Sequence, residues 1–411
     1  MNISWFIAKR IAIPKQKTFS SFIVKLCIFS TAISVAVMIM STALFDGFEH
    51  AITNKFYNSW GNIQVMNFDA SGSSFQQQTD LFLDSSMIRN LKSINGIKTI
   101  SPYTLQNVVL KTKKTIQGAM FKGIDKHFDW LRIEKFLIAG KRINYPDSGY
   151  SKQIIISSYQ AEKLNIKHGD SLIAYFVEQQ GDIPRARKLE VCGIYQTGLI
   201  ENDKLFAFAD AQLIHKIKND SSINIFGYEV TIANPADANS IQQQMQDNFI
   251  AAPLEAYRIQ QRFSYIFQWL GLIKSDLSII YIIMLIVAVM NIISGILILI
   301  LERTQMVGIL KSVGAPNIKI QSVFYWQSIY ICAIGIAIGI IFAVTLCLLQ
   351  QYFPFLKLDP KVYYVNYVQV NLNMIKIAVI ALGTFAICGM LLLIPTYLVN
   401  KINPIKALRF D

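Results

Sequence analysis

Few residues in this chain have the type and spacing that catalysis or metal binding requires. Its four histidines are scattered along the sequence: His50, His127, His168 and His215. Asp125 and Asp129 stand at helical spacing, but a solvated surface explains such a pair better than acid–base chemistry does. The one Gly-Lys pair, Gly140-Lys141, is followed by Arg142 instead of Ser or Thr, so the sequence has no phosphate-binding P-loop. We therefore expect a chain that is not an enzyme and that itself binds neither a metal nor a cofactor.

The composition is that of a membrane protein. Of the 411 residues, 53% are hydrophobic and 16% are charged, against about 25% charged in soluble proteins. Four uncharged runs each exceed or reach the roughly 20 residues that a helix needs to cross a bilayer: Leu26–Phe45, Leu277–Leu301, Ile320–Leu356 and Ile377–Asn400. They predict a polytopic α-helical protein with transmembrane helices at 22–45, 276–301, 322–350 and 374–399. Because no Asp, Glu or Arg interrupts these runs, ion-coupled transport is disfavoured and energy has to come from a partner.

Basic residues mark one side of the membrane. Residues 46–273 hold 24 Lys and Arg against 22 Asp and Glu, whereas the rest of the chain holds 15 against 4. Eleven of those 15 lie in or beside the N-terminal segment 1–21, the connection 302–320 and the tail 400–411. The positive-inside rule then places both termini in the cytoplasm, and the large domain 46–273 and the short loop 351–373 outside.

The large domain alternates short β-type runs with helical patterns, which predicts a mixed α+β fold. The β-type runs are Asn107–Leu110, Ile154–Ser157, Ser171–Val177, Leu189–Tyr195, Leu205–Ala209 and Tyr228–Ile232. Helical patterns cover Ser157–Leu164, Ala209–Lys216 and Pro235–Phe249. The amphipathic stretch Leu254–Gly271 is expected to continue into the second span as one long helix.

Small and polar residues inside the spans bear on helix packing. Gly335 and Gly339 form a G-x-x-x-G pair, which either lets two helix backbones approach closely or is ordinary glycine use in membrane helices. Asn291 is expected to hydrogen-bond to a neighbouring helix, and Pro395 to bend or end the fourth span.

The connection between the second and third spans carries a helical pattern. Apolar residues recur there at i, i+3, i+4 and i+7: Met306, Ile309, Leu310 and Val313. This spacing predicts a short helix with one apolar face, which Gly314 ends. An exposed apolar stripe on a connecting segment indicates contact with a partner or with the membrane surface.

This connection, from Glu302 to Ala315, resembles the E-R-x-x-x-I-G-I-L-K-x-x-G-A signature of FtsX-like/MacB-type ABC transporter permeases. The tail from Pro395 through Pro404 to Arg409 is similar to that family's closing P…I-x-P-x-x-A-L-R, and the order of one span, a large domain and three spans matches too. The resemblance implies docking into a separate cytosolic ATPase dimer, which holds ATP and Mg²⁺. The implied coupling residues are Glu302, Arg303, Met306, Gly308, Ile309, Leu310, Lys311 and Gly314.

Three further segments resemble the lipoprotein-releasing permeases of the LolC/LolE type. Leu358–Tyr364 resembles the L-D-P-x-x-Y-Y of their short outer loop, and Lys122–Asp125 resembles their R-G-I-D strand end. Gly181–Arg185 followed by Val191–Tyr195 resembles their G-x-I-P…V-x-G-I-F hairpin. The similarity covers the whole chain and implies an outer domain with a porter part, mapped to 50–130 and 225–270, and an inserted sabre part at 131–224.

The resemblance also implies a place and a role. The chain would sit in the inner membrane of a diderm bacterium and extract lipoproteins for sorting to the outer membrane. Its partners would be the ATPase dimer, a second permease copy or paralogue, the lipoproteins, the lipid bilayer and a periplasmic carrier chaperone, but no nucleic acid. Acyl chains would contact apolar side chains of the first two spans, for which plain helix packing is an equally good explanation: Met38, Met40, Phe45, Ile283 and Val287.

The implied chaperone hairpin contains Gly181, Ile183, Pro184 and Arg185, but the segment before its I-P motif is shorter than in the family. Either that contact is altered or a partner permease makes it. Two other functions stay open. One is a MacB-like mechanotransmission or efflux permease, although those proteins usually carry a fused ATPase. The other is an FtsX-like non-transporting regulator of a periplasmic enzyme, although the outer domain of such proteins is smaller than 46–273.

Overall fold

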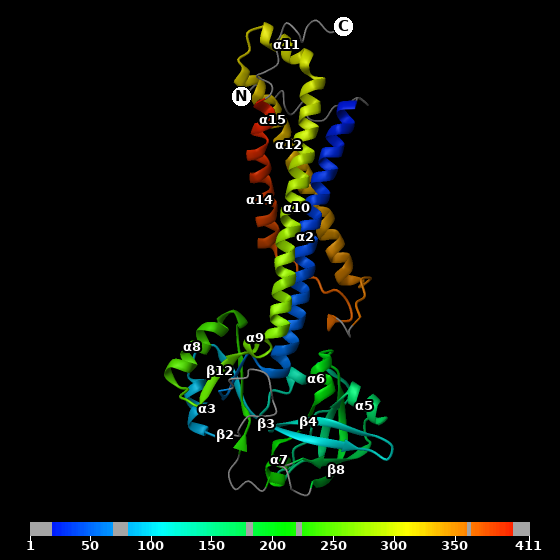
Figure 1. Ribbon diagram of the computed structural model, residues 1–411, viewed down its shortest axis with the longest axis vertical. Coiled ribbons are helices and arrows are strands. Elements are labelled where there is room, and N and C mark those ends of the chain that lie inside the picture. The colour runs from blue at the N-terminus through cyan, green and yellow to red at the C-terminus, as the bar shows by residue number, and fades with distance from the viewer. Residues whose placement is uncertain (1–18, 69–80, 178–183, 219–223, 360–362, 398–411) are drawn as a thin grey trace. The chain divides into compact units, whose positions relative to one another are not determined.

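The computed structural model describes residues 19–68, 81–177, 184–218, 224–359 and 363–397 (Figure 1). The chain divides into two compact units. The helical unit comprises Met1–His50, Trp269–Lys357 and Tyr367–Asp411, and the globular unit comprises Ala51–Gln268 and Leu358–Asn366. Two long helices run without a break from one unit into the other.

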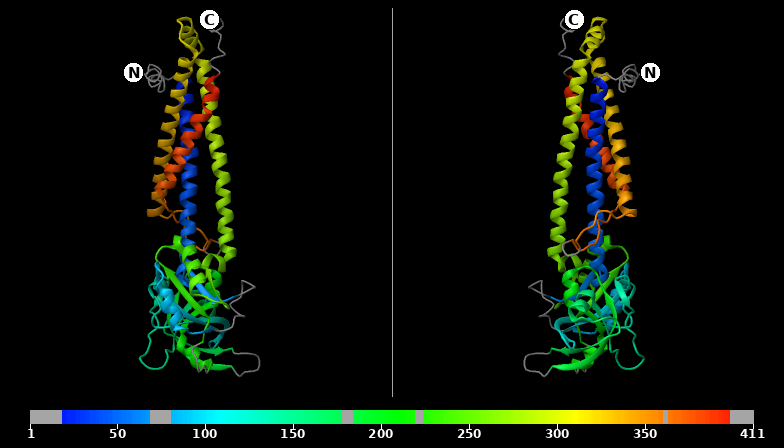
Figure 2. Two further views of the ribbon diagram at one scale, coloured as in Figure 1. Left: turned by 90° about the vertical axis from the view of Figure 1, so that its left-hand side faces the viewer. Right: turned by 90° about the vertical axis from the view of Figure 1, so that its right-hand side faces the viewer.

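Four helices among the described residues are long and apolar enough to cross a membrane, which confirms the four predicted spans. They are α2 (Phe19–Trp60), α10 (Ser264–Glu302), α12 (Asn317–Tyr352) and the consecutive pair α14 (Met374–Leu391) and α15 (Leu393–Tyr397). The first three extend beyond their predicted limits, most clearly α2, which continues past residue 45 to Trp60 (Figure 2). The short helix α11 (Thr304–Ser312) connects α10 to α12.

Small residues bring α12 close to α2 inside the helical unit. A Cβ atom placed on Gly339 would lie 2.6 Å from the carbonyl oxygen of Ala32, and one on Gly335 would lie 2.8 Å from Cβ of Thr31. Of the two explanations for the G-x-x-x-G pair, close approach of helix backbones is therefore confirmed. Side chains from all four spans complete one apolar core, including Ile39, Ile292, Phe324 and Cys388.

Polar contacts join α10 to α2. Asn291 Nδ2 donates to Ser30 Oγ, and the hydroxyl groups of Thr42 and Tyr281 lie 2.7 Å apart. The prediction that Asn291 bonds to a neighbouring helix is thus confirmed. The fourth span breaks at Leu392, between α14 and α15. Pro395 has no N–H to donate to the carbonyl of Leu391, so a bend at this point is expected, as predicted.

The globular unit is an α+β domain, as predicted. Its described strands form a ten-stranded sheet in the order β12-β1-β11-β3-β4-β9-β6-β8-β5, with β7 paired to β3 and β8, and a two-stranded sheet of β10 and β2. The strands are β1 (Ile63–Asn67), β2 (Leu81–Phe82), β3 (Ile97–Lys111), β4 (Ile116–Ile124), β5 (Leu137–Gly140), β6 (Gln153–Ser157), β7 (Ser171–Phe176), β8 (Arg185–Tyr195), β9 (Phe206–Asp210), β10 (Asn224–Ile225), β11 (Gly227–Ile232) and β12 (Leu254–Arg258). The helices are α3 (Ser85–Lys92), α4 (Leu131–Glu134), α5 (Ser158–Leu164), α6 (Ile200–Leu205), α7 (Ala211–Lys218), η1 (Pro235–Asp237), α8 (Ala238–Asn248) and α9 (Ile259–Arg262).

Strand β3 is shared by the two halves of the large sheet. Its first half pairs with β11 and its second half pairs with β4 and β7. The pairs β3-β4, β4-β9, β9-β6, β6-β8, β8-β7 and β7-β3 close into a ring. A core that includes Phe121, Ile156, Phe176 and Leu213 fills this part, and a second core that includes Val65, Leu91, Val230 and Met245 lies under β1 and β11.

Strand pairing crosses the predicted boundary at 131. β4 and the second half of β3, which the sequence mapped to the porter part, pair within the ring with strands of the predicted sabre part. The porter and sabre assignment itself stays a prediction.

The prediction of one helix over Leu254–Gly271 is wrong for residues 254–263, whereas residues 264–271 do continue into the second span within α10. Residues 254–258 form β12, which pairs antiparallel with β1 from Ile63↔Arg258 to Asn67↔Leu254. The short helix α9 follows, and the long helix α10 begins only at Ser264. Amphipathic spacing alone suggested a helix, but pairing with β1, a strand nearly 200 residues earlier in the chain, satisfies the backbone of this segment instead. The six predicted β-type runs each correspond to a strand, with only Val177 and Leu205 falling outside, and the three helical patterns correspond to α5, α7 and η1 with α8.

Candidate coupling helix and helix anchor

Helix α11 has well-defined ends. After Ser312 the chain makes a Schellman turn: the N–H of Gly314 donates to the carbonyl of Lys311 at 3.1 Å, and that of Ala315 to Leu310 at 2.9 Å. Gly314 has φ of +89°, a conformation that glycine adopts without strain. The predicted helix and the predicted role of Gly314 as its stop are both confirmed.

The apolar residues of α11 do not share the single exposed face that was predicted. Val307 and Gly308 are buried, and Met306 and Leu310 are half-buried against the core of the helical unit. Ile309 and Val313, by contrast, expose 50% and 82% of their surface. The helix is apolar on two sides, and packing against the other helices of its unit covers one of them.

The exposed side of this region is what remains available to a partner. Its apolar side chains come from α11 and its flanks: Leu301, Ile309, Val313 and Ile318. Of the other predicted coupling residues, Glu302 is exposed, whereas Arg303 and Lys311 are half-buried. Gly308 therefore contributes to packing within the unit, while Ile309 and Val313 stay exposed on its surface.

The five predicted substrate-contact residues are not brought together on one surface. Met38 and Phe45 are buried, and Met40 is half-buried against the core of the helical unit. Ile283 and Val287 are exposed on α10. Their role in binding acyl chains stays a prediction.

The predicted chaperone hairpin lies between β7 and β8. These strands pair antiparallel, with Phe176 opposite Arg185. Pro184 is exposed and Arg185 donates to the carbonyl of Ile217. Gly181 and Ile183 lie outside the described residues.

The loop between α12 and α14 belongs partly to the globular unit. Tyr364, in the segment that resembles L-D-P-x-x-Y-Y, has φ of +61°, and its carbonyl accepts a hydrogen bond from Lys55 Nζ at 2.5 Å. Beside it lies a cleft of about 590 Å³, lined in part by Tyr159, Glu201 and Asp359. Burial raises the pKa of Asp203, another lining residue, but its carboxylate accepts bonds from Thr197 and Gly198, so this group supports the local loop.

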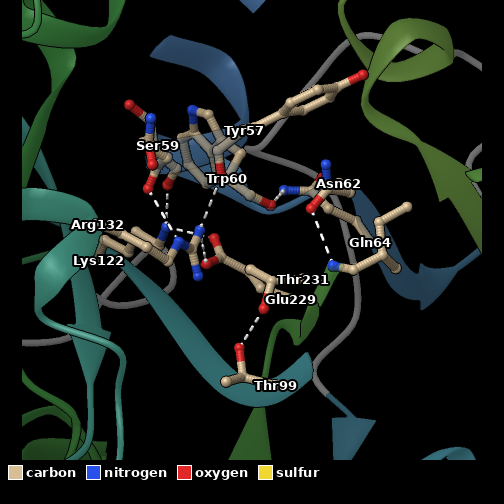
Figure 3. Close-up of polar contacts among 12 residues, drawn as sticks. Tyr57, Ser59, Trp60, Asn62, Gln64, Thr99, Lys122, Arg132, Glu229 and Thr231 are labelled. Atoms are coloured by element: carbon tan, nitrogen blue, oxygen red, sulfur yellow. Dashed lines mark hydrogen bonds and ion pairs between the residues drawn. The ribbon is translucent and has the colours of Figure 1, made fainter. Parts of the chain in front are cut away.

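The end of α2 in the globular unit is held by a buried cluster of charges, which we call the anchor: Lys122, Arg132 and Glu229 (Figure 3). Lys122 Nζ and Arg132 Nη2 each bond to one carboxylate oxygen of Glu229, the second at 2.9 Å. The three side chains expose 1%, 6% and 1% of their surface. They come from β4, α4 and β11, so the anchor joins three separate elements.

The anchor also bonds to the backbone at the end of α2. Arg132 donates from Nε to the carbonyl of Asn58 at 3.1 Å and from Nη2 to that of Tyr57 at 3.3 Å, and Lys122 Nζ donates to that of Ser59 at 2.6 Å. Gln64 Nε2 reaches the carbonyl of Trp60 at 3.4 Å. Carbonyls in the last turn of a helix lack partners within it. The carbonyl of Tyr57 also accepts from the N–H of Gly61 at 2.9 Å, and the side-chain contacts supply partners for those of Asn58, Ser59 and Trp60. Two cations complement the negative end of the helix dipole.

Aromatic rings surround the Lys122 ammonium group. Its Nζ lies 4.2 Å from the ring centroid of Trp60 and 5.4 Å from that of Tyr103. Burial is the main cause that lowers the pKa of Lys122 to about 8, Glu229 opposes this shift, and Arg132 adds to it. Removing one member of such a buried pair typically costs about 3–5 kcal/mol, because the other charge is left unpaired.

Two family models match the sequence over most of its length. The MacB-like periplasmic core domain matches residues 26–248, and the FtsX-like permease C-terminal model matches residues 278–404. The first alone covers more than half of the chain.

This chain belongs to the FtsX/MacB-like family of ABC transporter permeases.

Relatives named LolC and LolE align with the chain nearly from end to end. It is 23% identical to the lipoprotein-releasing system transmembrane protein LolE of Haemophilus influenzae and 21% identical to LolC of Neisseria meningitidis, with 99% of each chain covered in both cases. An uncharacterized membrane protein of Buchnera aphidicola from Schizaphis graminum is 26% identical, again over 99% of both chains.

Solved structures of outer domains from related permeases are also similar to this FtsX/MacB-like chain. The periplasmic region of MacB from Actinobacillus actinomycetemcomitans covers 50% of the chain and 91% of its own length, at 13% identity and a TM-score of 0.36. The extracellular domain of the ABC-type transporter YknZ from Gram-positive bacteria covers 48% and 99%, at 15% identity and a TM-score of 0.32. Both TM-scores are too low to carry an argument, and family membership depends on the sequence matches.

Sequence reasoning about this permease did not find the anchor. A signal was present, because Lys122 and Glu229 each lie in a strand with buried residues on both sides of the charge. The two residues are 107 positions apart, however, and only the pairing of β3 with both β4 and β11 brings them together. A charge in a buried strand predicts a partner but does not say which residue it is.

Proposed function

We propose that this chain is the permease subunit of an ATP-driven complex that extracts lipoproteins from the inner membrane for sorting to the outer membrane. The observation that carries this proposal is the alignment over 99% of the chain with proteins named as parts of the lipoprotein-releasing system. The exposed Ile309 and Val313 on α11 support it, because a connecting helix with unpaired apolar side chains suits docking to a second protein.

In this proposal ATP and Mg²⁺ are bound by a separate cytosolic ATPase dimer, and this chain supplies no catalytic group. The uneven distribution of Lys and Arg supports cytoplasmic termini and an outer domain in the periplasm. A second permease copy or a paralogue completes the membrane part. Carriage of the released lipoprotein by a periplasmic chaperone would use this chain or that partner.

Reconstitution tests the proposal. The chain, a partner permease and a lipoprotein-release ATPase are placed in proteoliposomes with a fluorescent triacylated lipoprotein, and a carrier chaperone is supplied outside. We expect ATP-dependent transfer of the lipoprotein to the chaperone, and no transfer with a non-hydrolysable nucleotide. Stimulated ATP hydrolysis without transfer would contradict lipoprotein release and favour the MacB-like efflux function. No stimulation of hydrolysis would favour the regulator.

A further inference from the structure

The anchor places three charged side chains where an apolar cluster could fill the same space. Aromatic rings already pack there: the ring centroid of Trp60 lies 6.1 Å from that of Tyr103 and 4.7 Å from that of Phe206. Replacing a buried ion cluster with apolar residues is often neutral or stabilising for a fold. The charges therefore call for a reason other than stability alone.

The direction of their hydrogen bonds supplies that reason. The donors of Lys122 and Arg132 point at the last carbonyls of α2, at Tyr57, Asn58 and Ser59. An apolar contact would let the helix end slide or rotate, because it has no preferred direction. Bonds to three consecutive carbonyls fix both the position and the rotation of the helix end, because hydrogen bonds weaken steeply when their angles change.

Only two residues, Gly61 and Asn62, separate the end of α2 from strand β1. Gly61 turns the backbone with φ of +76°, and the N–H of Asn62 then donates to the carbonyl of Val230 on β11 at 2.9 Å. Asn62 Oδ1 accepts from the N–H of Ile232 on the same strand at 3.1 Å. Glu229 of the anchor lies on this strand too. The end of α2 is thus linked to β11 in two ways: through Asn62, which follows the helix and bonds to β11 directly, and through Lys122 and Arg132, which bond to the helix carbonyls and to Glu229.

We infer that Lys122, Arg132 and Glu229 form a rigid joint through which movement of α2, driven by the ATPase in the helical unit, is passed to the strands β4 and β11 of the globular unit. The inference rests on the proposed function for the source of the movement. The three side chains are positioning residues: they touch no substrate, and they make α2 and the sheet move as one body.

Hydrogen–deuterium exchange on the full complex in nanodiscs tests the joint. Exchange is compared between the nucleotide-free complex and the complex trapped with ATP and vanadate. In the unaltered protein we expect a nucleotide-dependent change in exchange at β4 and β11. In Lys122→Met this change should stop at the end of α2, and amides 57–62 should exchange at least tenfold faster, while β6 and β7 stay protected.

Three further variants control the test. Lys122→Arg keeps the charge and the donors and should restore the nucleotide-dependent change. Lys204→Met removes a lysine whose ion pair with Glu201 is on the surface, and should behave as the unaltered protein. The double variant Lys122→Met/Glu229→Gln keeps the net buried charge and removes both members of the pair, so it carries the test should Lys122→Met fail to fold.

An unchanged response at β4 and β11 in the Lys122→Met and double variants would overturn the inference. So would the absence of any response beyond Trp60 in the unaltered protein, or failure of both variants to fold, which would make the cluster a requirement of folding only. Lipoprotein transfer is measured on the same samples. A complex that shows the response but transfers no lipoprotein would refute the proposed function and leave the joint standing.

Discussion

The fold changes the acid–base chemistry of Lys122. Burial lowers its pKa to about 8, so the group carries its charge at pH 7 and loses it in mildly alkaline solution. The anchor then has two cations and one anion at pH 7, and one of each once Lys122 is neutral. Arg132 contacts Tyr57, Asn58 and Glu229 through its own donors, none of which belongs to Lys122.

A pH dependence follows from this shift. The pKa of Lys122 is lower in the folded protein than in the unfolded chain, where it is near 10.5. The unfolded state therefore binds more protons between about pH 8 and 10.5, and the free energy of unfolding should rise with pH across that window, by at most about 1.4 kcal/mol per pH unit. Unfolding of the unaltered protein and of Lys122→Arg is compared at pH 7, 8, 9 and 10.

The Arg variant is the reference because its guanidinium group keeps its proton throughout this range. The stability of the unaltered protein relative to the variant should climb above pH 8. Two parallel curves would show that Lys122 keeps an ordinary pKa and that its burial is looser than the structure indicates.

At the scale of elements, α11 shows what local patterns can and cannot predict. Its helix and its glycine stop follow from spacing and from the backbone preference of Gly314, both of which are local. Which apolar side α11 exposes depends on how α10 and α12 pack against it, and the spacing of apolar residues carries no information about that packing. The prediction for the segment that forms β12 failed for the same reason, because its pairing partner β1 is far away in sequence. The four spans were predictable since each helix satisfies its own backbone in a bilayer.

Charge on the exposed side of α11 should uncouple the ATPase. Ile309→Glu should lower stimulation of a purified partner ATPase at least tenfold without changing the folded yield, because Ile309 does not pack in the core. Ile116→Glu is the matched control, since Ile116 is similarly exposed, at 65%, but lies on β4 of the globular unit. Full stimulation by Ile309→Glu would refute docking through this side of the helix.

The close contact of α12 with α2 should make Gly339 intolerant of even one added carbon. Gly339→Ala would place Cβ at 2.6 Å from the carbonyl oxygen of Ala32, and overpacking of this kind costs about 1–3 kcal/mol. Gly383→Ala on α14 is the control, because nothing lies within 4 Å of its added Cβ. Thermal unfolding in the same detergent should show a lower midpoint for Gly339→Ala alone. Equal midpoints would mean that the two helices have room to separate.

At the scale of the whole molecule, the chain reads as the membrane half of a two-part machine. It combines four apolar helices, a connecting helix with exposed apolar side chains and an α+β unit that bonds to the end of α2. Family and architecture were predictable because they depend on motifs and composition. The anchor was not, because it depends on which strands pair.

Depletion of this chain in its own host, followed by separation of the inner and outer membranes, tests the central claim most directly. The account predicts that outer-membrane lipoproteins accumulate in the inner membrane as the chain is lost, and that the unaltered gene restores their sorting whereas Ile309→Glu does not. Normal lipoprotein sorting in depleted cells would contradict the account.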